Sequence, residues 1–374
     1  MSGARDDRVT ELGRLIRLPE DVRHRGRALE SLGTASADET EAAADRIRHY
    51  VASDAFGKLR PEVRAAFLAI TDGSRSPDDH RTSLEAIVQT TGRPALRILK
   101  GFIDPLDPEA AGWAELEALE APIRTLTASV GRIDLQGAHV GTGFVVAPGC
   151  VLTNRHVLEQ IARAFAGGKG ETWLMSGGEI TIDFDAEDGT MGSRRFRIRD
   201  VVNTGPDPIE GRLDLRKVDA AVLGVETVNA RGDALPDPVP LASPGAPALA
   251  GPSKIVSIGY PGPPDFSPAG ATPTPDEVAV LAALKRIFAY RYGVKRLSPG
   301  RIRLIPGEVE KAGAHIFTHD ATTLGGASGS LIASLDREGP RVVGLHFGGE
   351  LLRRNFGLAV PTLRKTLLKG LALA

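Results

Sequence analysis

From residue 129 to residue 374 the chain breaks into short apolar runs separated by turn residues, and this pattern limits the fold more than any other feature. Glycine and proline stand between many of the runs. The clearest runs are 141–146, 151–153, 179–184, 220–223, 254–259 and 342–346. Short runs at this spacing are typical of β-sandwiches and β-barrels. The region therefore predicts a mainly β fold.

Three stretches in this region have characters of their own. Residues 276–290 have helical spacing and follow a Pro- and Gly-rich segment, so they predict a helix carried by an insertion loop. Residues 236–252 are rich in proline and alanine and predict a link between two barrels. Arginine alternates with apolar residues over 194–199, which predicts a strand with one charged face.

The residues before 129 follow a helical period instead. Ser36-Ala37-Asp38-Glu39 forms a capping box, and Ser76-Pro77 begins a further helix. We expect a small helical domain over 1–92, a connector over 93–128 with a helix near Trp113–Leu126, and the β domain over 129–374. No cluster of catalytic residue types occurs in 1–92, so we expect this domain to regulate the protein or to recruit a protein partner.

Composition excludes several classes of function. The formal net charge of the 374 residues is −1, which gives no electrostatic basis for nucleic-acid binding. The first residues lack the apolar core of a secretion signal, and the chain has no run of 18 apolar residues. Cys150 is the only cysteine, so no internal disulfide can form. These features predict a cytoplasmic protein that does not bind a membrane.

A histidine in a specific context is the first candidate catalytic residue. His156 lies in Thr153-Asn154-Arg155-His156-Val157, after the run that begins at Gly141-Thr142-Gly143-Phe144 and a Pro-Gly turn. A neutral imidazole with an ordinary pKa near 6.5 suits a general base at physiological pH. We therefore expect His156 to take a proton from a nucleophile.

Two aspartates compete to orient this base. Asp219 begins the apolar run Ala220–Leu223, where an unpaired carboxylate would be costly, and Asp214 lies between Leu213 and Leu215. Either carboxylate could hold the imidazole in the required tautomer.

A glycine-rich loop carries the candidate nucleophile. Ser328 lies in Gly325-Gly326-Ala327-Ser328-Gly329-Ser330, where glycine allows a tight turn. The N–H groups of Gly326 and Ser328 are the expected oxyanion donors. The order His, Asp, Ser is that of chymotrypsin-type enzymes, whereas an α/β-hydrolase has the order Ser, acid, His and a Gly-x-Ser-x-Gly elbow. The motif order therefore excludes an α/β-hydrolase fold.

These motifs together resemble those of bacterial trypsin-like serine peptidases without disulfides, and they are similar to those of the glutamyl endopeptidases. The resemblance covers roughly 129–374 and rests on 153–157, 259–261, 295–300, 319–324, 325–330, 343–349 and 355–361. It implies a chymotrypsin-like double antiparallel β-barrel with the catalytic triad His156, Asp219 and Ser328 in the cleft between the barrels. The run after Asp219 matches the family's acid motif, which favours Asp219 over Asp214. Relatives usually have Asn or Asp where this chain has Ala327.

The resemblance also implies substrate-binding residues. Thr322 takes the position at the base of the primary pocket, where a preference for Lys or Arg would need an aspartate. Thr323 and His346 occupy the positions that hold a substrate carboxylate in glutamyl endopeptidases. The backbone of Phe347, Gly348 and Gly349 should pair with the substrate as an added strand. Cleavage after Glu or Asp is the first expectation, and cleavage after a small or apolar residue is the second.

No cofactor or metal is expected. His315, His319 and Asp320 could suggest a metal site, but a strand leading into the nucleophile loop explains their spacing. We therefore interpret the chain as a serine endopeptidase acting on a protein or peptide. The alternative is a peptide-binding or scaffolding protein that uses a trypsin-like cleft with little turnover.

Overall fold

The computed structural model describes residues 92–167, 170–189, 194–209, 213–264, 275–335, 339–350 and 353–373. The predicted helical domain at 1–92 lies outside the described residues, except for Gly92. The chain divides into two compact units, Met1–Thr82 with Asp265–Val278 and Ser83–Pro264 with Ala279–Ala374. Nearly all described residues belong to the second unit, and the fold below is that of this unit.

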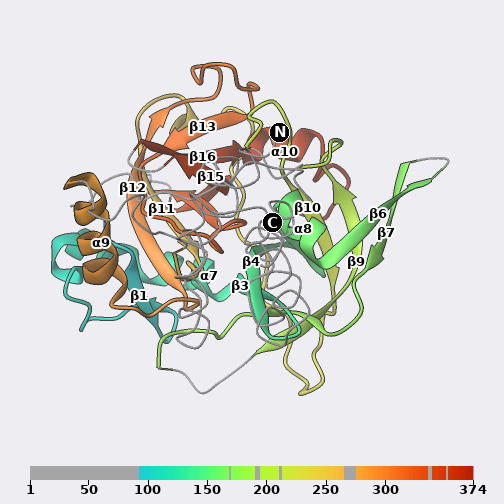
Figure 1. Cartoon of the computed structure of the whole chain (residues 1–374), viewed down its shortest axis with the longest axis horizontal. Coiled ribbons are helices and arrows are strands. Elements are labelled where there is room, and N and C mark those ends of the chain that lie inside the picture. Colours follow the sequence, from blue (N-terminus) through green and yellow to red (C-terminus); the bar gives the residue numbers. More distant parts are fainter. Residues whose placement is uncertain are drawn as a thin grey trace, which may run out of the picture. The chain divides into compact units, whose positions relative to one another are not determined.

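Six antiparallel strands close the first barrel in the order β10-β5-β4-β3-β8-β9 (Figure 1). The strands are β3 (Val130–Leu135), β4 (Ala138–Ala147), β5 (Cys150–Thr153), β8 (Ile180–Asp183), β9 (Arg195–Thr204) and β10 (Ala221–Val225). Alternate side chains fill its interior, among them Val145, Ile182 and Phe196, which are inaccessible to solvent. In β9, Phe196 and Ile198 are buried while the neighbouring arginines are exposed, so the predicted one-sided strand is confirmed.

A second set of six strands closes another antiparallel barrel in the order β11-β14-β15-β16-β13-β12, with β12 pairing back to β11. These strands are β11 (Lys254–Gly259), β12 (Arg296–Leu304), β13 (Ile316–His319), β14 (Leu331–Ser334), β15 (Arg341–Glu350) and β16 (Arg354–Ala359). Phe317 fills the interior because Gly344 and Gly357 leave room for its ring. A Cβ atom at either glycine would lie 2.4 Å from Phe317 Cζ. The mainly β, double-barrel expectation is thus confirmed.

The connector belongs to the same body as the second barrel. It contains β1 (Leu96–Leu99), β2 (Phe102–Ile103), the 3₁₀ segment η2 (Ala110–Leu119) and helix α7 (Glu120–Ala128). Strand β1 pairs antiparallel with the start of β12, and Figure 1 labels both strands. The helix expected near 113–126 is present as η2 and α7. The side chains of Leu96, Ile98, Leu116 and Ile123 are completely buried.

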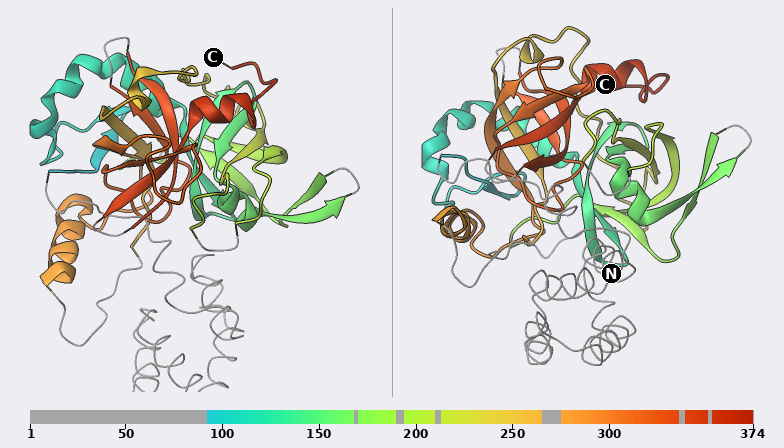
Figure 2. Two further views of the ribbon diagram at one scale, coloured as in Figure 1. Left: turned by 90° about the horizontal axis from the view of Figure 1, so that it is seen from above. Right: turned by 45° about the horizontal axis from the view of Figure 1, so that its top comes forward.

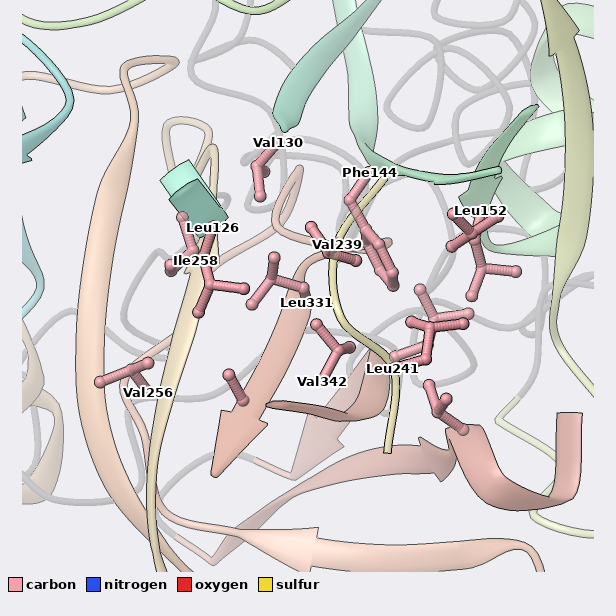
Figure 3. Packing of buried hydrophobic residues seen from close by; sticks show 14 of the residues in the cluster. Leu126, Val130, Phe144, Leu152, Val239, Leu241, Val256, Ile258, Leu331 and Val342 are labelled. Atoms are coloured by element: carbon pink, nitrogen blue, oxygen red, sulfur yellow. The ribbon is translucent and has the colours of Figure 1, made fainter. Parts of the chain in front are cut away.

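An apolar cluster joins the two barrels (Figure 3). Val130, Phe144 and Leu152 enter it from the first barrel. The second barrel and the flanking segments contribute Leu126, Val239, Leu241, Val256, Ile258, Leu331 and Val342. Burial of apolar surface on this scale favours one rigid arrangement of the barrels. Residues 236–252 lie between β10 of the first barrel and β11 of the second, so the link between barrels that the composition predicts is confirmed.

The remaining elements are peripheral. Helix α8 (Arg155–Ile161) leads into a hairpin of β6 (Ala162–Gly167) and β7 (Gly170–Met175), which projects from the first barrel (Figure 2). Helix α9 (Pro275–Phe288) confirms the helix expected in the insertion. The short η3 (Pro247–Leu249) lies in the link, and α10 (Val360–Lys365) follows β16. Among the described residues, no helix has the length and hydropathy needed to span a membrane.

Candidate active site

Antiparallel pairing of two strands brings His156 to Asp219. Thr153 at the end of β5 lies opposite Ala221 at the start of β10. The histidine follows Thr153 by three residues and the aspartate precedes Ala221 by two, so both lie at the same end of the barrel. Asn154 reinforces this by donating its side-chain N–H to the carbonyl of Asp219 at 2.8 Å.

The carboxylate of Asp219 holds His156 at two points. His156 Nδ1 lies 2.6 Å from Oδ2, and the backbone N–H of His156 donates to Oδ1 at 2.9 Å. This N–H belongs to the first turn of α8, where backbone donors have no partner within the helix. Asp219 therefore fixes both the backbone and the ring. The carboxylate side chain is 7% exposed and the imidazole is 26% exposed, so water reaches only the imidazole freely.

Asp214 has a different partner. Its carboxylate accepts two hydrogen bonds from the guanidinium of Arg216, at 2.9 Å and 2.8 Å. This pairing lowers the pKa of Asp214 to about 2. The carboxylate that contacts His156 is thus that of Asp219.

The loop that carries Ser328 is a tight turn built on glycine. Gly326 and Gly329 have φ angles of 89° and 90°, a conformation that other residues rarely adopt. The turn is closed by N–H donation from Ala327 to Leu324 and from Ser330 to Ala327. Ser328 itself is buried, with 8% of its surface exposed.

Gly141 on β4 separates the Ser328 loop from the helix that carries His156. A Cβ atom on Gly141 would lie 2.7 Å from Val157 Cγ2 and 3.4 Å from the carbonyl oxygen of Ser328. Only a residue without a side chain fits between these two groups. The Ser328 loop of the second barrel thus lies close to Val157, the neighbour of His156, with Gly141 between them.

Four candidate substrate-binding side chains lie in the second barrel. Thr322 is buried and donates its hydroxyl to the carbonyl of Arg93 at 2.6 Å. Thr323 is 3% exposed, and its Oγ1 has no hydrogen-bond partner among the described residues. His346 is completely buried on β15. Phe347 follows it and is 5% exposed.

His346 forms a pair with a second buried histidine. His319 Nε2 lies 3.2 Å from His346 Nδ1, and the ring centroids are 5.3 Å apart. Burial, together with the neighbouring His346, lowers the pKa of His319 well below its ordinary value of 6.5. His319 therefore stays neutral at physiological pH. Sequence reasoning noted His319 only as a weak metal candidate and missed this pairing.

The end of β15 pairs on one side only. Residues 344–350 of β15 pair with β16, whereas β14 reaches only as far as Leu345. Within the described part of the chain, no further strand pairs with Phe347, Gly348 or Gly349. This backbone thus has the geometry of a strand edge.

Comparisons with known proteins identify the family. A model described as a trypsin-like peptidase domain matches residues 141–345, which is more than half of the chain. The chain belongs to the trypsin-like peptidase family. A protein of Lysobacter enzymogenes named probable serine protease is 36% identical over 303 residues, covering 77% of this chain and 75% of that protein. The chain is thus a serine endopeptidase.

Solved structures that the comparison matches include the inactive form of the Rv3671c protease. It is 22% identical with a TM-score of 0.38, over 70% of this chain and 95% of that one. Mouse neuropsin is 10% identical with a TM-score of 0.41, over 64% of this chain and 93% of that one.

Two residues of the peptidase that sequence reasoning missed support the Ser328 loop. Thr142 on β4 donates its N–H to the Ser328 carbonyl at 2.8 Å and its hydroxyl to the Gly326 carbonyl at 3.0 Å. His139 lies against Gly326, where a Cβ atom would be 2.6 Å from its Cε1. The sequence offered one signal for Thr142, which is its position in the glycine-flanked run before His156.

The residues considered for a metal have protein partners. His319 pairs with His346, and Asp320 accepts hydrogen bonds from Arg93. His315 Nε2 lies 3.3 Å from the carbonyl of Lys217. Among the described residues, no three His, Cys, Asp or Glu side chains gather as a metal site would require.

Proposed function

We propose that the peptidase cleaves peptide bonds through a triad of His156, Asp219 and Ser328. The observation that carries this proposal is the double contact of Asp219 with the ring and the backbone of His156. Such a carboxylate holds the imidazole with its hydrogen on Nδ1, so that the lone pair of the base is on Nε2.

The reaction would follow the two-stage course of serine peptidases. His156 Nε2 takes the hydroxyl proton of Ser328 as Oγ attacks the substrate carbonyl carbon. The proton then passes to the leaving amine as the peptide bond breaks, which leaves an acyl group on Ser328. Water, deprotonated by the same imidazole, releases the acid and restores the serine.

Backbone donors at the nucleophile loop would stabilise the oxyanion. We assign this role to the N–H groups of Gly326 and Ser328. The Gly326 N–H donates to no protein acceptor among the described residues, although its carbonyl is bound by Thr142. One donor of this kind typically contributes about 10²–10³ in rate.

A fluorophosphonate probe tests the nucleophile directly. The wild-type chain should be labelled at Ser328, and Ser328→Ala should not be labelled. Labelling requires an activated serine, so it also separates an active peptidase from a binding protein with little turnover. Absence of labelling in a folded wild-type chain would contradict the proposed triad.

The acid of the triad has a matched control in the same chain. Asp219→Asn should lower kcat by about 10⁴, because the amide favours the wrong tautomer of the imidazole. Asp214→Asn, which breaks only the pair with Arg216, should leave kcat within about twofold. A larger loss of kcat in Asp214→Asn than in Asp219→Asn would show that the acid is wrongly assigned.

For specificity, we propose that the primary pocket accepts an acidic side chain. The hydroxyl of Thr323 is buried and has no hydrogen-bond partner in the part of the chain that the structure describes, and such a group is costly unless a ligand satisfies it. If His319 Nε2 donates to His346 Nδ1, the ring hydrogen of His346 lies on Nε2, which can donate to a carboxylate. Hydrogen bonds of this kind to a charged carboxylate are short and strong.

Phe347, Gly348 and Gly349 would bind the backbone of the same substrate. Their strand edge supports the addition of an extended peptide as a further strand. Thr322 is assigned to the wall of the pocket rather than to a direct contact, because its hydroxyl already donates to Arg93.

A peptide library that varies only the residue before the cut tests this specificity. Cleavage after Glu or Asp should dominate, and His346→Ala should abolish that preference more than it lowers labelling by the fluorophosphonate. Dominant cleavage after Lys or Arg would overturn the pocket assignment. Dominant cleavage after small or apolar residues would favour the second expectation.

We also propose that residues 1–92 form a helical domain that recruits a protein partner, and that the enzyme acts in the cytoplasm. The single cysteine supports a reducing compartment. A pull-down with residues 1–92, compared with residues 93–374, should recover a partner on the first segment alone. Equal recovery on both segments would contradict the recruiting role.

A further inference from the structure

We propose that Arg93 is a positioning residue for the primary specificity pocket, because it holds the segment 319–324 through Asp320 and Thr322. The inference rests on the proposed function, in which this segment forms part of the pocket. Arg93 lies outside both barrels and 227 residues before Asp320.

The guanidinium of Arg93 binds the carboxylate of Asp320 with two hydrogen bonds. Nε donates to Oδ1 at 3.0 Å, and a terminal nitrogen donates to Oδ2 at 2.9 Å. Arg303 forms an ion pair with Oδ2 at 2.6 Å, and the backbone N–H of Arg301 donates to Oδ1 at 2.7 Å. Each carboxylate oxygen is therefore in contact with two nitrogen atoms. Such complete pairing is what allows a charge to be fully buried, as Asp320 is.

The backbone of Arg93 makes a second contact with the segment. Its carbonyl accepts the hydroxyl hydrogen of Thr322 at 2.6 Å. Arg93 thus binds the residues on both sides of Ala321. The carbonyl of Ala321 accepts a hydrogen bond from Asn355 at 2.7 Å, so the segment is also tied to β16. Thr323 follows directly, and its position depends on these contacts.

The two guanidinium groups on Asp320 differ in exposure and origin. The side chain of Arg93 is 14% exposed, whereas that of Arg303 is 49% exposed. An exposed ion pair contributes little, but removal of a desolvated, bidentate partner leaves the buried carboxylate poorly compensated. Loss of Arg93 should therefore disturb the segment far more than loss of Arg303.

The proposed catalytic pair does not depend on these contacts. His156 and Asp219 lie in the first barrel, and Thr142 holds the nucleophile loop from β4. A disturbed segment 319–324 should accordingly change which side chain the enzyme accepts while the serine stays reactive. This separation of effects distinguishes positioning of the pocket from a general loss of folding.

The test uses the full chain with Arg93→Met, and Arg97→Met serves as a matched control. Arg97 lies on the neighbouring β1 and pairs with Asp104, Asp107 and Asp188, not with the segment. The readouts are kcat/KM over peptides that differ only before the cut, and the rate of fluorophosphonate labelling at Ser328.

Arg93→Met should reduce the ratio of kcat/KM between the preferred and other residues by about tenfold or more, with labelling within about twofold of wild type. Arg97→Met should change neither the kcat/KM ratio nor the rate of labelling. Arg93→Lys should restore only part of the preference, since a single ammonium cannot bind both carboxylate oxygens as a guanidinium does. Thr322→Val, which removes only the contact with the Arg93 carbonyl, should shift the preference in the same direction and less.

Unchanged preference in both Arg93→Met and Thr322→Val, in an active enzyme, would overturn this inference alone. An equal loss of preference in Arg97→Met would also overturn it, because the effect would then come from the connector as a whole. If Arg93→Met does not fold, the inference is judged on Thr322→Val, and an unchanged preference in that variant would overturn it. A wild-type chain that is neither labelled nor active would instead contradict the proposed function, and this inference with it.

Discussion

The two barrels hold their candidate functional side chains by different means. In the first barrel, adjacent strands bring His156 and Asp219 into direct contact, and their positions follow from strand pairing nearby. In the second barrel, the segment before Ser328 is held by Asn355 on β16 and by Arg93, which lies outside both barrels. The first barrel thus assembles its pair from its own adjacent strands, whereas the segment 319–324 of the second barrel also depends on the connector.

This difference predicts how substitutions should divide between rate and selectivity. Changes at the pair of the first barrel should lower kcat for every substrate. Changes at the segment of the second barrel should alter the ranking of substrates. Ser328 is the expected exception in the second barrel, because as the proposed nucleophile it would take part in every turnover.

The largest expected effect is a loss of kcat on substitution of the proposed triad, to which both barrels contribute residues. His156→Ala and Ser328→Ala should each lower kcat by several orders of magnitude, and the double variant should be little worse, because residues that act as one unit are not additive. Single-turnover kinetics on a small peptide would measure this. If the double variant instead lost kcat by the product of the two single factors, the two residues would contribute independently.

Truncation of the connector should have the next largest effect. Residues 92–374 retain Arg93 and β1 and should hydrolyse a small peptide at close to the rate of the full chain. Residues 129–374 lack Leu96, Ile98, Leu116 and Ile123, each worth roughly 1.5–3 kcal/mol when fully buried. That sum approaches the whole stability of a typical domain, so this chain should not fold.

Circular dichroism and peptide hydrolysis together check the truncation. A folded chain of residues 92–374 with no activity would contradict the view that residues 1–91 are not catalytic. A folded and active chain of residues 129–374 would show that the second barrel does not need the connector.

A smaller effect concerns stability where the barrels meet. Lys295 donates to the carbonyls of Thr127 and Phe184, and burial lowers its pKa from 10.5 to about 8. Between these values the unfolded chain binds more protons than the folded one, so the free energy of unfolding should rise with pH from about 8 to 10.5. The gain should be on the order of 3 kcal/mol.

Urea unfolding at pH 7 to 10 measures this gain, with Ser328→Ala as background to prevent self-cleavage. Lys295→Met should remove the rise that the lysine causes, whatever its effect on stability at neutral pH. The same slope in both chains would mean that other groups cause the pH dependence.

The smallest expected effect is that of chelator and reductant. The triad needs no metal, and the single cysteine, Cys150, cannot form an internal disulfide. Activity should therefore stay within error in a chelator and in a thiol reductant. Loss in chelator with recovery on addition of a divalent ion would contradict this expectation.

The sequence by itself determined the features that short motifs encode. The runs 141–146 and 254–259 predicted strands because alternation and turn residues are local properties, and both runs lie within strands. The glycines around Ser328 predicted a tight turn because residues other than glycine rarely adopt the backbone angles found at Gly326 and Gly329. The same motifs nominated His156, Asp219 and Ser328, and they pointed to the family that the comparisons identify.

Only the tertiary structure decided which buried polar groups meet. The pairing of His319 with His346 and that of Arg93 with Asp320 leave no trace in local spacing, because these partners lie 27 and 227 residues apart. Each pair forms because a charge or a ring nitrogen inside a barrel must find a partner where the fold provides one. The motif after Asp219 favoured this residue over Asp214, but the contact of its carboxylate with His156 depends on strand register, which a single sequence does not specify.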